Sequence, residues 1–117
     1  MRIFDSELKV LDILWREGGT TASRIAEILA EKTAWSKTTT YTVIQKCIAK
    51  GAVGREEPNF VCHALITREQ AQEAETRALI DKMFDGKSDQ LMASILGRKK
   101  LSPKEIKRLK DLISKLS

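Results

Sequence analysis

Hydroxyl groups crowd one short stretch of the chain, WSKTTTYTVI at residues 35–44. Threonine is a poor helix former because its branched Cβ loses rotamer freedom against the preceding turn. Yet the stretch opens with Ser36, a good helix cap, and runs into VIQKCIAKG, which has the pattern of a helix that ends at Gly51. Hydroxyls at the front of a helix can bond to phosphate oxygens or base edges, and a threonine methyl can pack on a thymine methyl. The stretch therefore predicts a helix over residues 36–50 whose first turns face DNA.

Cys62 and His63 are the other residues that invite a chemical interpretation. They are neighbours in a predicted strand, so their side chains face opposite ways and one chain cannot easily chelate a metal with both. Cys47 falls on the inner face of the threonine-rich helix, where a free cysteine behaves as a small hydrophobe. Two cysteines and one histidine are too few for a disulfide framework or a closed zinc site, so we expect no metal, no cofactor and a reducing, cytoplasmic compartment. A thiol- or metal-responsive regulator that uses Cys62 and His63 stays open as an alternative.

Enzymes and membrane proteins are the classes that the sequence disfavours. It has no Ser/His/Asp set with a plausible nucleophile, no phosphate-cradling glycine loop and no clustered carboxylate pair. No apolar run approaches the roughly 18 residues that a membrane span needs. The first residues lack a small-residue cleavage site, so we expect no signal peptide.

The net charge of +5 and the pI of about 9.4 favour an anionic partner. The excess is uneven: residues 1–66 carry nine basic and eight acidic residues, whereas residues 67–117 carry twelve and eight. The positions of the basic residues in the first half must therefore matter more than how many there are. DNA binding requires that these basic residues lie on the same face as the threonines: Lys37, Lys46, Lys50 and Arg55. Glu56 and Glu57, close to Arg55, favour a different alternative, a protein-interaction module that does not bind DNA.

The elements that position these residues are predicted from caps and periodicity. The first helix is capped by Asp5 or Ser6 and stops at the glycines that follow Glu17, and Thr21 caps a second helix. After the threonine-rich helix, apolar residues recur at every second position, which predicts a hairpin with strands over 52–55 and 60–66. Three more helices follow from Thr67. Of these, one is capped by Ser88 and ends at Gly97, and the last opens with the capping box of Ser102–Glu105.

Helix, helix, helix and hairpin is the order of a winged helix-turn-helix, in which the third helix enters the major groove. We therefore predict a mainly α protein with a winged helix-turn-helix DNA-binding domain over residues 1–66. Residues 67–117 are predicted to form a three-helix dimerisation domain.

Four segments in order carry a resemblance to a known family: LKVLDILWREGGTTASRIAEIL, WSKTTTYTVIQKCIAKGAV, ETRALIDKMFDGK and LSPKEIKRLKDLI. The chain resembles the penicillinase-repressor family, the winged-helix repressors of β-lactamase and methicillin-resistance genes and the copper-responsive repressors. The resemblance implies a homodimeric transcriptional repressor that binds a palindromic double-stranded DNA operator. By position it implies recognition contacts from Thr38, Thr39, Tyr41 and Thr42 and backbone contacts from Ser36 and Lys46. Lys37 and Arg55 complete the predicted DNA-binding set.

The same resemblance implies that the C-terminal helices interlock to form the dimer. The apolar residues predicted for this interface are Leu79, Met83, Leu91, Ile95, Ile106, Leu109, Ile113 and Leu116. In the β-lactamase branch a regulatory protease cuts within the dimerisation region. The matching bond here is Ser94–Ile95, although the family's Asn-Phe pair is absent.

Overall fold

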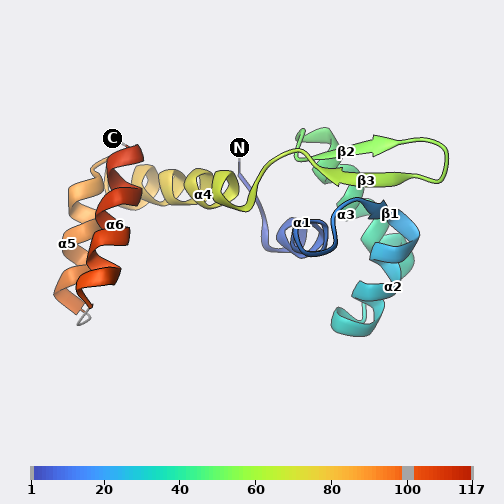
Figure 1. Cartoon of the computed structure of the whole chain (residues 1–117), viewed down its shortest axis with the longest axis horizontal. Coiled ribbons are helices and arrows are strands. Elements are labelled where there is room, and N and C mark those ends of the chain that lie inside the picture. The colour runs from blue at the N-terminus through green and yellow to red at the C-terminus, as the bar shows by residue number, and fades with distance from the viewer. Residues whose placement is uncertain (1, 99–101, 117) are drawn as a thin grey trace. The chain divides into compact units, whose positions relative to one another are not determined.

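The computed structural model describes residues 2–98 and 102–116 and confirms a mainly α protein with the winged-helix order of elements (Figure 1). The elements are α1 (Asp5–Glu17), β1 (Thr20–Thr21), α2 (Ala22–Thr33), α3 (Lys37–Ala49), β2 (Val53–Glu56), β3 (Val61–Ala64), α4 (Arg68–Met83), α5 (Ser88–Arg98) and α6 (Pro103–Leu116). The chain forms two compact units, one over residues 3–71 and one from Gln72 onward that also takes Arg2.

Side-chain caps fix where most of the helices begin. In α2, α3 and α6 the predicted cap is confirmed, because its hydroxyl oxygen accepts a hydrogen bond from the N–H three residues on at 3.1–3.2 Å: Thr21, Ser36 and Ser102. Thr67 caps α4 in the same way, with the Gln70 N–H donating to its hydroxyl at 3.0 Å. Each cap satisfies a backbone donor that has no partner inside the helix.

Three predicted helix ends are wrong: the start of α1 and both ends of α5. α1 begins at Asp5, so its cap position is Phe4, and the Phe4 N–H donates instead to a carboxylate oxygen of Glu7 at 2.8 Å. This carboxylate is buried beside the helix start, where it can replace a capping side chain. α5 already includes Ser88 as its first residue and continues past Gly97 to Arg98. A helical glycine is tolerated when the following residue still has a carbonyl one turn back to bond.

The wing is the hairpin of β2 and β3, which run side by side in a three-stranded antiparallel sheet of order β1-β3-β2 (Figure 1). Val53 faces Ala64 and Glu56 faces Val61, so the predicted hairpin is confirmed. The third strand was not predicted: β1 pairs with β3 through two residues that immediately precede α2. This pairing fixes the wing to the first helices.

One continuous core joins the three helices and the sheet of the first unit. Its fully buried members include Leu11 from α1, Ile25 from α2, Ile44 from α3 and Val53 and Cys62 from the wing. Trp35, which precedes the cap of α3, packs against this cluster. The inner face of α3 therefore packs against α1, α2 and β2.

Trp15 anchors the first turn of α4 to α1. Its indole N–H donates to the carbonyl oxygen of Ile66 at 2.9 Å, and the guanidinium of Arg68 lies 4.8 Å from the centre of its ring. Arg68 also pairs with Asp12 at 2.8 Å. The ring is therefore structural, and it closes the winged-helix unit after the wing.

The second unit has a much smaller core. Ile80 and Leu91 are buried in it, with Phe84 and Ile95 packed against them. Leu79 and Met83 are left 45% and 64% exposed. The side chains of Ile113 and Leu116, both predicted at the dimer interface, lie outside the described part of the structure. Across the residues that are described, no helix is long and apolar enough to cross a membrane.

Candidate nucleic-acid interface

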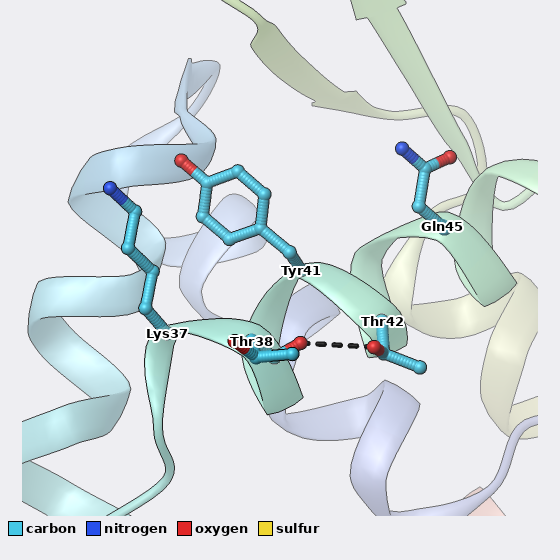
Figure 2. Close-up of a pocket in the computed structure, with 5 residues that line it drawn as sticks. All are labelled: Lys37, Thr38, Tyr41, Thr42 and Gln45. Carbon is cyan, nitrogen blue, oxygen red and sulfur yellow. Dashed lines mark hydrogen bonds between the residues drawn. The ribbon is translucent and has the colours of Figure 1, made fainter.

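The helix α3 has one buried face and one polar face. Thr40, Val43, Ile44 and Cys47 are buried because they recur at three- and four-residue spacing against the core. On the opposite side Thr38, Thr42 and Gln45 are exposed, and we call these three residues the recognition face. With Lys37 and Tyr41 they line a shallow hollow of about 400 Å³ (Figure 2).

The threonine hydroxyls have different environments. The Thr42 hydroxyl donates to the carbonyl oxygen of Thr38 at 2.9 Å, which leaves its oxygen able to accept from a base (Figure 2). The Thr39 hydroxyl accepts from Ser36 at 3.0 Å at the helix start. Thr40 is fully buried, and its hydroxyl has no hydrogen-bond partner among the described residues. Three of the four threonines can therefore reach a ligand, and Thr40 belongs to the core.

Gln45 is a residue of this face that was not predicted. It lies seven residues after Thr38 and three after Thr42, about two turns and one turn along the helix, and it lines the same hollow (Figure 2). Its amide carries both a donor and an acceptor, the combination that pairs with the major-groove edge of adenine. The spacing alone could have found it, because the three residues share one helical stripe.

Tyr41 joins the recognition helix to the wing. It is half-buried, and its ring meets the ring of Phe60 edge-on with centroids 5.8 Å apart. The ammonium of Lys37 lies 5.5 Å from the centre of the tyrosine ring. Edge-to-face aromatic pairs of this kind prefer a fixed relative orientation. Tyr41 thus has a packing contact in addition to its place beside the recognition face.

The four basic residues expected on the face of the threonines do not all lie there. Lys37 and Lys46 are exposed on α3, as expected. Lys50 is not part of this face: its ammonium is 2.6 Å from a carboxylate oxygen of Glu7 in α1 and 4.1 Å from the centre of the Phe4 ring. Its charge neutralises a buried carboxylate, so it cannot at the same time serve a phosphate.

Arg55 is on the wing and is also paired. Its guanidinium lies 3.6 Å from the centre of the Phe60 ring and forms an ion pair with the Glu57 carboxylate. Both members of this pair are exposed, at 41% and 60% of the side chain, so the pair can exchange with solvent or with a ligand. Arg55 is therefore accessible to DNA, with an acidic competitor beside it.

Both thiols are buried, which bears on the thiol-responsive alternative. Burial is the main cause that raises the pKa of Cys47 to about 12, with the Glu7 charge adding to it and the Lys50 charge opposing it. Burial also raises the pKa of Cys62, and its side chain lies in the core while His63 is half-exposed. A reactive cysteine needs its thiolate form at neutral pH. In the described part of the chain, no three His, Cys, Asp or Glu residues are grouped so that they could hold a metal ion.

Alkylation with iodoacetamide tests the state of these thiols. At pH 8 we expect the native protein to gain no adduct within minutes and the urea-unfolded protein to gain two, measured by intact-mass spectrometry. The sign follows from the raised pKa of Cys47: at pH 8 the unfolded thiol is partly ionised and the native thiol is not, and between pH 9 and 12 the unfolded thiol is mostly ionised while the native thiol stays mostly protonated. Stability should therefore fall as pH rises from 9 towards 12. Rapid native labelling of Cys62 would instead support a sensory thiol.

The exposed polar stripe on a core-anchored third helix, followed by a wing, defines a winged helix-turn-helix protein. Comparison with known proteins gives the family. The sequence pattern of the family described as penicillinase repressor matches residues 3–115, so this chain belongs to the penicillinase repressor family. The members of this family are DNA-binding transcriptional repressors and not enzymes, and the resemblance seen in the sequence is confirmed.

Similar proteins align over nearly the whole chain at low identity. The methicillin resistance regulatory protein MecI of Mammaliicoccus sciuri is 25% identical over 115 residues, which cover 97% of this chain and 94% of the relative. The penicillinase repressor of Bacillus licheniformis is 23% identical over 96% of this chain and 89% of its own length. An uncharacterized 16.5 kDa protein of Latilactobacillus sakei is 26% identical over 96% of this chain and 78% of its own length.

Proposed function

We propose that the chain is a homodimeric transcriptional repressor that places α3 in the major groove of a palindromic operator. The observation that carries the proposal is the exposed stripe of Thr38, Thr42 and Gln45 on a helix whose other face is buried in the core. Short side chains let such a helix approach the floor of the groove. The free N–H groups and positive dipole end of the helix start at Ser36 attract a phosphate.

The proposed contacts divide into two kinds. Base contacts come from the exposed hydroxyls, the amide and the tyrosine: Thr38, Thr39, Tyr41, Thr42 and Gln45. Backbone contacts come from the helix start and the exposed cations: Ser36, Lys37, Lys46 and Arg55. The first kind carries sequence preference and the second kind carries affinity and salt dependence.

Dimerisation through the second unit is supported by its poorly covered apolar surface. Only Ile80 and Leu91 among its described residues form a buried core, while Leu79 and Met83 are exposed and line a hollow with Ala78. A unit of this size is stabilised when a second copy covers such side chains. We therefore propose Leu79 and Met83 as interface residues, together with the other predicted positions: Leu91, Ile95, Ile106, Leu109, Ile113 and Leu116.

Proteolytic release at Ser94–Ile95 is not included in the proposal. The bond lies inside α5, and both residues are half-buried, so the helix must open before a protease can cut it. The Asn-Phe pair of the family is absent at this bond.

Fluorescence anisotropy of the chain's own upstream DNA tests the proposal across a salt series, with an unrelated duplex as competitor. We expect competitor-resistant binding by two chains per operator and a steep loss of affinity with salt. Lys46→Ala should weaken binding to all sequences alike and reduce the slope of log affinity against log salt by about one. Lys107→Ala removes the same charge from the exposed surface of α6 and should leave both values unchanged.

Weak binding that unrelated DNA matches, with no effect of Lys46→Ala, would contradict the proposal. It would favour the protein-interaction module instead. One observation supports that second candidate: Lys50 and Arg55 are both neutralised by glutamates of the same unit.

A further inference from the structure

The tip of the wing is acidic, which is unusual for a hairpin that lies along a DNA backbone. Glu56 ends β2 and Glu57 follows it, and each carboxylate lies beside a cation or a basic group of the hairpin. Glu57 forms its ion pair with Arg55, and a carboxylate oxygen of Glu56 lies 3.2 Å from Nε2 of His63. The two glutamates therefore have different partners: Glu57 pairs with the guanidinium of Arg55, whereas Glu56 lies beside the imidazole of His63.

A row of side chains places Arg55 beside the recognition helix. The guanidinium of Arg55 lies over the ring of Phe60, and the Phe60 ring meets the Tyr41 ring edge-on. At the other end of this row, the ammonium of Lys37 lies over the Tyr41 ring. All of these residues belong to the first unit. The guanidinium is therefore held by the stacking contact next to α3, and it can turn its donors towards a phosphate without moving the wing.

We propose that Glu57 is a positioning residue that limits sequence-independent DNA binding by occupying the guanidinium of Arg55. A carboxylate and a phosphate present the same paired acceptor oxygens to the fork of a guanidinium, so they compete for it. Contacts to phosphate carry no sequence information, so this competition lowers affinity for every duplex. The inference rests on the proposed function, because it assumes that the wing lies against DNA.

The consequence is that base contacts from α3 make up a larger share of total binding. Unrelated sites far outnumber an operator, so a repressor with weak phosphate contacts spends less time on them. From the sequence alone, the acidic wing tip argues against DNA binding. In this proposal, Glu57 lowers the affinity for DNA of any sequence without preventing operator binding.

Glu57→Gln tests the inference, with Glu56→Gln as its matched control, since each variant removes one negative charge from the wing tip. Affinity for an unrelated duplex is measured by anisotropy at several salt concentrations. We expect Glu57→Gln to raise this affinity about two- to fivefold more than Glu56→Gln does, a size typical of an exposed ion pair. The salt slope should steepen by about one for the phosphate that Arg55 gains.

The same pair of variants in an Arg55→Gln background completes the test. There the extra gain from Glu57→Gln should vanish, because no guanidinium is left to release. Equal gains from the two glutamine variants, or a difference that persists without Arg55, would overturn the inference while operator binding by the unmodified protein still upholds the proposed function. If the unmodified protein binds neither the operator nor unrelated DNA, the proposed function fails and the inference fails with it.

Discussion

Lys50→Met should lower the free energy of unfolding by about 2–4 kcal/mol, because it leaves a buried carboxylate without its cation. The Glu7 side chain is 1% exposed, and one of its oxygens accepts from both the Lys50 ammonium and the Phe4 N–H. Methionine keeps most of the aliphatic length of lysine but lacks the ammonium, with its charge, its hydrogen bond to Glu7 and its contact with the Phe4 ring. Urea unfolding followed by circular dichroism measures the change.

Two variants separate the ion pair from general effects of losing a lysine. Lys46→Met removes an exposed ammonium from the same helix, one turn earlier, and should change stability by less than about 0.5 kcal/mol. Adding Glu7→Gln to Lys50→Met should recover most of the loss, since a neutral amide can still accept from Phe4. A Lys50→Met protein as stable as the Lys46→Met protein would show that this pair does not anchor α3 to α1.

The double substitution Thr42→Ala with Gln45→Ala should reduce the preference for the operator over unrelated DNA by about 10- to 100-fold, the range expected when contacts to one or two bases are lost. Both side chains are exposed on the recognition face, so the fold and the phosphate contacts should be unchanged. The ratio of the two affinities, measured by competition at one salt concentration, reports the change.

Thr40→Val is the matched control for these hydroxyls. It also removes a threonine hydroxyl from α3, but this one is fully buried and has no hydrogen-bond partner in the part of the chain that the structure describes. Operator preference should stay the same, and stability should be equal or higher because an unsatisfied buried hydroxyl is unfavourable. An unchanged preference in the double variant would mean that the recognition face is not what meets the bases.

The fold could be predicted in large part because its signals are local. The caps at Thr21, Ser36 and Ser102, and the change of period after Gly51, each depend on residues within a few positions of one another. β1 escaped prediction for the opposite reason. A strand of two residues has no period, and it exists only because β3, about 40 residues later, offers it hydrogen bonds.

The site was harder to predict where side chains pair over long distances. Lys46 and Lys50 look alike in the sequence, four positions apart on one helix, yet only Lys50 reaches Glu7, whose position is 43 residues away. The sequence predicts Arg55 at the interface, but it does not predict the ion pair of Arg55 with Glu57. Gln45 was not predicted because it carries an amide and no hydroxyl, so only its helical spacing from Thr38 and Thr42 connects it with them.

The division of α3 into two faces has a consequence for how such proteins diverge. Val43, Ile44 and Cys47 are constrained by the core, whereas Thr38, Thr42 and Gln45 make no contribution to it. Substitutions at these three positions can accumulate with little effect on folding. Under the proposed function, a duplicated copy of this chain would come to bind a different operator through a few point mutations, while its scaffold stays the same.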